Sequence, residues 1–174
     1  MPLEFITHNG DQYPKFQSEG FAAQFAIPVA KKVLYGKGLD VGCNRKEWAY
    51  PDAYFLVDPE ISADFHAMKL PDNDTDHKGQ WDYIFSSHLL EHLPDWVGVL
   101  EYWHSRLKPG GILFLYLPDS NHQTYWRPWF NRKHVNYFIP QILHQYIEDS
   151  PLWGDGVVSG TDCNSSFIAY AQKL

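Results

Sequence analysis

The chain has 174 residues and a net charge of −7, from 14 Lys and Arg against 21 Asp and Glu. This length fits a single domain over residues 1–174, and the acidic balance argues against stand-alone nucleic-acid binding, which needs a basic face. Two cysteines cannot build a disulfide framework, no apolar run approaches the ~18–20 residues of a membrane span, and the N-terminus lacks a signal-peptide pattern. We therefore expect a cytoplasmic protein with no membrane partner.

The N-terminal region, residues 1–35, is expected to form a helical cap. Its first dozen residues are polar and are predicted to be irregular. Apolar residues then recur at four-residue spacing from Phe21 to Val33, which predicts a helix within residues 14–34 that Gly20 and Pro28 interrupt.

Short apolar runs follow, each bounded by loop residues. They predict strands at residues 38–42, 54–58, 63–66, 81–87 and 112–117, and a final pair at 157–161 and 165–171. Helical spacing predicts helices over residues 89–107 and 140–147. The strands are almost continuously apolar, as in a parallel sheet covered on both faces, so the pattern predicts an open, doubly wound α/β fold.

Acidic residues and a glycine stand where the predicted strands end. In open parallel sheets, ligands bind beyond the carboxyl ends of the strands. Gly42 would let the backbone approach a cofactor closely, and Asp58 follows Asp40 by 18 positions, near the ~20-residue offset of a ribose-binding carboxylate. Asp64 and Phe65 could contact an adenine. Together these positions predict a nucleotide-type cofactor site.

The same segments carry a family resemblance, which extends from about residue 38 to the end of the chain. The runs GLDVGCN, WDYIFSSHLLEHLPDW and LKPGGILFLYLPD, in this order, resemble the class I S-adenosylmethionine-dependent methyltransferases. The small-molecule branch similar to ubiquinone-biosynthesis methyltransferases is the nearest match, and the segment from His134 to Phe138 also looks like that branch.

The resemblance implies a Rossmann-like, mostly parallel, seven-stranded sheet with an antiparallel last strand, and S-adenosyl-L-methionine as cofactor. It places Asp40, Gly42 and Cys43 at the methionine end of the cofactor and Asp58 on the ribose. Asp64 and Phe65 would flank the adenine, and Ser86, Ser87 and His88 would lie beneath the sulfonium. The cofactor-binding residues predicted in this way are Asp40, Gly42, Cys43, Asn44, Asp58, Asp64, Phe65, Ser86 and Ser87.

The chain departs from the family pattern in its glycine loop and its helices. Asn44 stands in place of the second loop glycine, which is acceptable because Asn tolerates positive φ better than most residues. The crossover from residue 42 to 54 is barely long enough for a helix, and the helix between the second and third strands is expected to be absent. These departures keep open an alternative function, a non-catalytic methyltransferase-like binding module.

The predicted reaction is methyl transfer to a small-molecule or glycan acceptor, most readily O-methylation with a histidine as general base. Histidine suits this task near neutral pH, and His88 and His134 are the catalytic candidates, with His122 as a third. Residues 119–148 form a predicted substrate-side insertion, whose aromatic run at residues 125–130 could stack on an acceptor or pack as a lid.

Other enzyme classes fit less well. The string from His88 to His92 matches the inverted zinc-peptidase pattern H-x-x-E-H, but it emerges directly from a buried strand, so we predict no metal site and a packed His92. A dinucleotide oxidoreductase is disfavoured because the pattern G-x-G-x-x-G is absent from the sequence.

Overall fold

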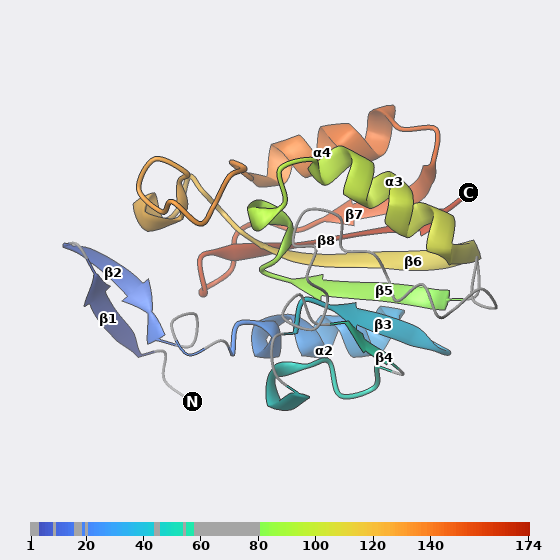
Figure 1. The fold of residues 1–174 in the computed structure, drawn as a ribbon, viewed down its shortest axis with the longest axis horizontal. Helices are drawn as coiled ribbons and strands as arrows, with labels where there is room; N and C mark the ends of the chain where they lie inside the picture. Colours follow the sequence, from blue (N-terminus) through green and yellow to red (C-terminus); the bar gives the residue numbers. More distant parts are fainter. Residues whose placement is uncertain are drawn as a thin grey trace.

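The computed structural model describes residues 4–8, 10–15, 19, 21–43, 46–53, 55–57 and 81–174. Their main feature is a sheet with strand order β4-β3-β5-β6-β8-β7 (Figure 1). The strands are β3 (Gly38–Val41), β4 (Phe55–Val57), β5 (Trp81–Ser87), β6 (Leu107–Pro118), β7 (Trp153–Val158) and β8 (Ser166–Lys173).

The strand directions confirm the predicted α/β fold of Rossmann type. Strands β4, β3, β5 and β6 pair in parallel, whereas β8 is antiparallel to both β6 and β7. The described residues contribute six strands to this sheet, so the expected count of seven is not confirmed. The strand predicted at residues 63–66 lies outside the described residues.

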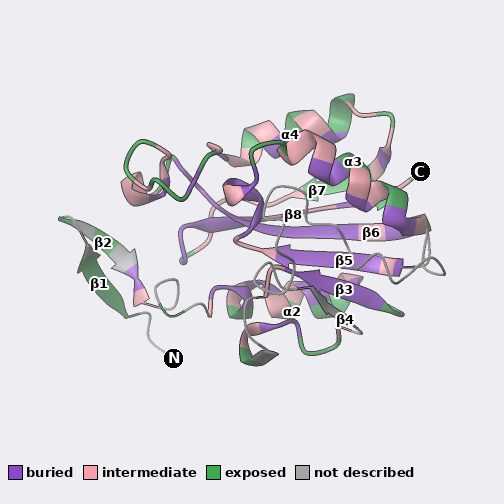
Figure 2. Cartoon of the chain, in the orientation of Figure 1, coloured by how far each residue is buried: buried purple, intermediate pink, exposed green. Residues whose placement is uncertain are grey.

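Helices cover both faces of the sheet, because alternate residues of the central strands point to opposite sides. Tyr83 and Phe85 pack with the helix α2 (Ala23–Val33), whereas Ile84 between them packs with α3 (Trp96–Arg106) and α4 (Pro140–Asp149). Figure 2 shows β5 and β6 buried along most of their length. The apolar strands of the sequence are therefore explained by burial on two faces.

The N-terminal residues correct one prediction. Strands β1 (Phe5–His8) and β2 (Asp11–Pro14) form an antiparallel hairpin where irregular structure was expected. The dipeptide Asn-Gly at positions 9–10 is a strong signal for a two-residue hairpin turn, and Gly10 has a φ of 88°. The hairpin lies beside the short helix η4 (Thr124–Trp126), where Gln123 Nε2 donates a hydrogen bond to Gln12 O.

The helix predicted at residues 89–107 is also wrong in its first part. A 3-10 turn, η3 (Leu90–His92), is followed by an extended Leu93 with φ −99° and ψ 112°. Pro94 causes this break, since the residue before a proline avoids helical angles. The helix α3 then starts at Trp96, and the Asp95 side chain caps it by accepting a hydrogen bond from Gly98 N at 3.0 Å.

Other predictions differ from the structure in their bounds, notably β6, which begins at Leu107 rather than at residue 112. Among the described residues of the first crossover, the structure shows a 3-10 turn, η1 (Lys46–Trp48), consistent with the short length of the crossover. Strand β7 begins at Trp153, before the range 157–161 that the sequence suggested. Among the described residues, no helix combines the length and the apolar character that crossing a membrane requires.

Candidate active site

The strand order reverses next to β3, which pairs with the following strand β4 on one side and with β5 on the other. Val41, the last residue of β3, lies opposite Val57 of β4 and Ser86 of β5. Such a switch point, at the carboxyl ends of parallel strands, is where open α/β sheets bind ligands. The turn after β3 and the segment after β5 therefore frame the candidate site.

The turn after β3 requires a glycine. Gly42 has a φ of +90°, and a Cβ atom at this position would lie 2.7 Å from Leu89 Cδ2. The turn therefore packs directly against the residue two positions after the end of β5. Cys43 follows it and is half-buried. The other predicted cofactor contacts at this edge, Asn44, Asp58, Asp64 and Phe65, lie outside the described residues.

Asp40 is turned toward the protein's own backbone. Its residue is only 1% exposed, and Oδ2 accepts a hydrogen bond from the backbone N–H of Tyr50 at 2.6 Å. Burial raises the pKa of Asp40 to about 7, and the hydrogen bond from Tyr50 opposes this rise. The carboxyl group thus links the first crossover to β3 through this hydrogen bond, close to the Gly42 turn.

Ser86 and Ser87 lie at the end of β5, as predicted, but they differ in what they contact. Ser86 is buried, and its Oγ donates a hydrogen bond to Val41 O at 2.9 Å, which links the ends of β3 and β5. Ser87 is half-buried at the strand end, where it pairs with Tyr116 of β6.

His88 occupies the centre of the candidate site. It has a φ of 50°, and its ring packs edge-to-face against Tyr116 and Trp126, with centroid distances of 5.3 and 5.8 Å. Its Nε2 lies 3.1 Å from Ser166 Oγ. Burial first, then the neighbouring His134 and His92, hold the pKa of His88 well below its ordinary value, so its ring is neutral at neutral pH.

A polar network beside His88 was missed by the sequence analysis. The Tyr116 hydroxyl donates to Asp162 Oδ2 at 2.7 Å and accepts from Asn164 Nδ2 at 3.0 Å. Burial raises the pKa of Tyr116, which keeps the phenol protonated. These side chains come from the end of β6 and the loop before β8, so only the pairing of those two strands brings them together.

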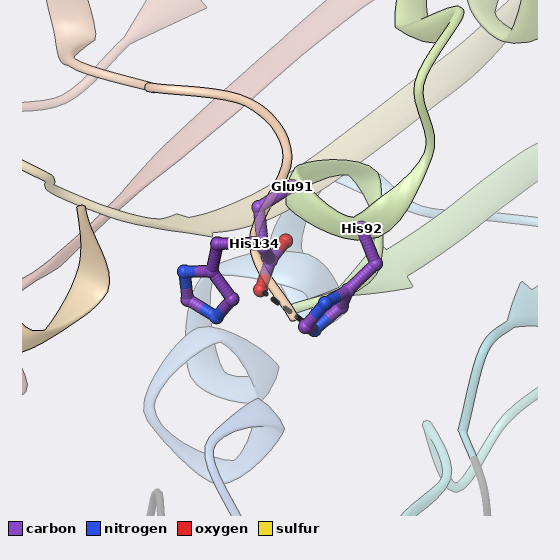
Figure 3. A group of neighbouring side chains, drawn as sticks. All are labelled: Glu91, His92 and His134. Carbon is purple, nitrogen blue, oxygen red and sulfur yellow. Dashed lines mark ion pairs between the residues drawn. The ribbon is translucent and has the colours of Figure 1, made fainter. Parts of the chain in front are cut away.

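Glu91, His92 and His134 form a second cluster next to His88. One potential ligand atom from each of the three lies within 4.8 Å of the other two (Figure 3). The imidazole rings of His92 and His134 are 4.8 Å apart between centroids, and His92 Nε2 lies 3.7 Å from Glu91 Oε1. Burial lowers the pKa of His134 to about 4.

The inverted zinc-peptidase pattern is not supported by this geometry. That pattern needs both histidines on one face of a helix, but the 3-10 turn covers only Leu90–His92, and His88 precedes it with a positive φ. His88 instead meets Ser166, whereas His92 Nδ1 lies 2.7 Å from Lys133 O.

The aromatic run at residues 125–130 contains both buried and exposed rings. Trp126 is buried against His88, whereas Trp129 and Phe130 are 64% and 54% exposed. Trp129 stacks on Tyr137 at 5.7 Å, and the Arg127 guanidinium lies 5.8 Å from the Trp129 ring centre. The exposed half leaves aromatic surface that an acceptor could contact.

Comparison with known proteins gives the class to which this fold and site belong. A family model described as a methyltransferase domain matches residues 15–150, so the chain belongs to this family. The predicted fold, that of the class I S-adenosylmethionine-dependent methyltransferases, is confirmed.

Similar proteins include the ubiquinone biosynthesis O-methyltransferases of Escherichia coli and Hydrogenovibrio crunogenus. The E. coli enzyme is 25% identical over 132 residues, which cover 74% of this chain and 54% of the relative. The H. crunogenus enzyme is 25% identical over 99 residues, which cover 55% of this chain and 41% of the relative. The chain thus spans about half or less of the length of these relatives.

Solved structures share the fold. A methyltransferase from Thermotoga maritima, described as a possible histamine N-methyltransferase, has a TM-score of 0.67 at 16% identity and covers 91% of this chain and 93% of its own. A Burkholderia thailandensis 1,6-didemethyltoxoflavin N1-methyltransferase, solved with bound 1,6-didemethyltoxoflavin and S-adenosylhomocysteine, has a TM-score of 0.58 at 14% identity. The match covers 90% of this chain and 80% of that structure.

Proposed function

We propose that this protein transfers the methyl group of S-adenosyl-L-methionine to a hydroxyl oxygen of a small-molecule or glycan acceptor. The observation that carries the proposal is the contact between the Gly42 turn and the segment that follows β5, at the switch point of a methyltransferase-family sheet. In this proposal the cofactor therefore binds beside His88, a neutral histidine.

The residues around the Gly42 turn fit a bound cofactor. A Cβ atom at Gly42 would clash with Leu89, so only a glycine lets the turn lie this close to the segment after β5, and the turn keeps its shape through the hydrogen bonds of Asp40 and Ser86 to neighbouring backbone. When bound, S-adenosylmethionine supplies an electrophilic methyl group on a sulfonium. In this proposal Cys43 and Ser87 contact its methionine end, and Asp58 accepts hydrogen bonds from the ribose hydroxyls.

His88 is the proposed general base. The residue follows β5 directly, its ring is held between Tyr116 and Trp126, and it is neutral at neutral pH. A neutral imidazole at this place can accept the proton of an acceptor hydroxyl as the methyl group arrives. His134 is a second candidate, since it lies in the same cluster of rings.

The names of similar proteins support transfer to oxygen. The ubiquinone biosynthesis relatives are O-methyltransferases at 25–30% identity. On the acceptor side, Trp129 and Phe130 offer exposed rings for stacking, and Arg127 offers a cation for an acidic group. Residues 119–148 are accordingly the proposed substrate-side insertion.

The first experiment is calorimetric titration with S-adenosylhomocysteine. Saturable one-site binding in the wild type, lost in Asp58→Ala and kept in the exposed control Asp52→Ala, is the expected result. A wild type that binds no S-adenosylhomocysteine would contradict the proposal and favour the alternative of a non-catalytic binding module. Equal affinity in Asp58→Ala would remove the ribose assignment alone.

The second experiment addresses chemistry. Transfer of labelled methyl groups to phenolic, catecholic and sugar acceptors is measured for the wild type and for His88→Gln. We expect His88→Gln to lose turnover while its affinity for S-adenosylhomocysteine stays within a factor of about two. Unchanged turnover in that variant would exclude His88 as the base.

A further inference from the structure

The Glu91 carboxylate is buried without a hydrogen-bond donor. The residue is 1% exposed, and neither carboxylate oxygen has a hydrogen-bond partner in another described residue. Burying a carboxylate in this way costs several kcal/mol unless a cation or donors compensate it. Imidazole nitrogens of His88 and His92 lie 3.5 and 3.7 Å from Oε1, beyond ordinary hydrogen-bond distance.

Two histidines present their Nε2 atoms to this carboxylate. His92 Nδ1 lies 2.7 Å from Lys133 O, and His134 Nδ1 lies 2.8 Å from Trp126 O. A carbonyl oxygen only accepts hydrogen bonds, so in both rings Nδ1 carries the proton and the neutral ring has its lone pair on Nε2. The two lone pairs and the carboxylate therefore converge, an arrangement that is repulsive until a proton or a metal cation lies between them.

Hydrogen bonds to backbone carbonyls join the two chain segments that carry the cluster. The Glu91 carbonyl accepts from Val135 N at 2.8 Å and from Asn136 N at 3.1 Å. The Asn136 side chain donates to Leu90 O at 3.1 Å and to Leu93 O at 2.6 Å. These bonds join the segment of Glu91 and His92 to the loop that carries His134, so the three side chains are brought together without a ligand.

We infer that Glu91, His92 and His134 bind one first-row divalent transition-metal ion, with the carboxylate and the two Nε2 atoms as its ligands. Metal-binding histidines commonly donate their second nitrogen to a backbone carbonyl, as both rings do here. Figure 3 shows the three side chains pointing toward one another.

The ligand types select the ion. Two imidazoles with one carboxylate suit Zn²⁺, Co²⁺, Mn²⁺ or Fe²⁺, whereas Mg²⁺ and Ca²⁺ prefer sets made only of oxygen. Ligands at about 2.0–2.2 Å from a shared ion lie roughly 3–3.6 Å apart. The present limit of 4.8 Å between the atoms therefore requires a closure of about 1–2 Å. His92, with a 25% exposed side chain, gives access from solvent.

Three ligands do not complete the coordination of the ion. The inference that the ion also binds the methyl acceptor rests on the proposed function. Three protein ligands leave at least one position open, as in catalytic metal sites. The open position lies beside His88, whose Nδ1 is 3.5 Å from Glu91 Oε1. An acceptor whose hydroxyl oxygen binds the metal at this position would therefore have that oxygen close to His88. His134 then serves as a ligand, and the role of base falls to His88 alone.

Metal binding is tested first, without cofactor or acceptor. Protein treated with a chelator and dialysed is titrated with Co²⁺, followed by its visible absorption bands, and the Co²⁺ is then displaced with Zn²⁺. The expected result is one Co²⁺ per chain, displaced by one Zn²⁺, with a rise in the thermal unfolding midpoint on metal addition. No binding, or binding of Mg²⁺ but not Co²⁺, would overturn the inference.

Variants locate the bound ion. Glu91→Gln and His134→Ala are each expected to weaken Co²⁺ binding by more than about 10-fold. The control is His144→Ala, because exposed His144 lies 3.2 Å from Glu148 and could bind metal adventitiously. Equal binding in all variants, or loss only in His144→Ala, would refute the site. Circular dichroism monitors folding, and His92→Gln, which changes a partly exposed side chain, serves if Glu91→Gln fails to fold.

Activity separates the two proposals. With an acceptor found, metal-free protein is expected to bind S-adenosylhomocysteine normally but to lose turnover, which Zn²⁺ or Co²⁺ restores. Full turnover without metal would leave the proposed function intact and reject the role of the ion at the acceptor. Metal binding without any cofactor binding would reject the proposed function and leave the metal site standing.

Discussion

Replacing Asp40 with asparagine is expected to stabilise the protein at alkaline pH. The folded protein raises the pKa of Asp40 from 3.8 to about 7 because the carboxyl group is buried. Between these values the folded state retains a proton that the unfolded chain releases, so the free energy of unfolding falls as pH rises from about 4 to 7. Asparagine carries no ionisable proton, and its side-chain oxygen can still accept the hydrogen bond from Tyr50 N.

The size of the effect follows from the pKa change. About three pKa units at about 1.4 kcal/mol each give an upper limit of about 4 kcal/mol. Asp40→Asn should match the wild type near pH 4 and exceed its stability at pH 8 by an amount up to this limit. Urea unfolding curves at pH 4, 6 and 8 measure the difference, with exposed Asp52→Asn as control. A variant less stable than the wild type at pH 8 would refute the reasoning, because the ionised carboxylate would then stabilise the fold.

Two other substitutions test the frame of the site. Gly42→Ala places a Cβ atom in contact with a buried leucine at a φ of +90°, so we expect a loss of about 1–3 kcal/mol in unfolding free energy and weaker S-adenosylhomocysteine binding. Gly160→Ala, with open space around its Cβ, should change neither quantity. Asn136→Ala removes the side-chain donor to the Leu93 carbonyl and one of two donors to the Leu90 carbonyl, which also accepts from Leu93 N, and should cost about 1–3 kcal/mol in urea unfolding. A cost below about 0.5 kcal/mol would mean that water replaces the amide.

The sheet was predictable because its physical signal is local. A strand buried on both faces is apolar at every position, and for this reason β5 was predicted with its observed bounds, Trp81–Ser87. The break in the next helix was also readable, since Pro94 forces Leu93 out of helical angles, but the apolar spacing across it obscured that signal. The hairpin turn at Gly10 was missed in a segment judged only by its polarity.

The site was predictable only where it follows from strand ends. Gly42 and His88 stand at the ends of β3 and β5, so the switch-point rule places them together. The pairing of Glu91 with His134 depends on a loop that returns to the sheet edge through the hydrogen bonds of Val135 and Asn136. No periodicity in the sequence encodes such a return, so the string around Glu91 was considered in the sequence analysis only as a zinc-peptidase pattern, which was disfavoured.

The position of β8 has a consequence for how this chain is made. Residues Ser166–Lys173 follow every other described strand in the sequence, yet they lie inside the sheet, between β6 and β7. Phe167 and Ala171 are fully buried there. Until the ribosome has released these residues, β6 presents an open apolar edge that can pair with other chains. Completion of the sheet, and of the His88–Ser166 contact, therefore has to wait until β8 has been synthesised, and shortening β8 should produce aggregation during expression.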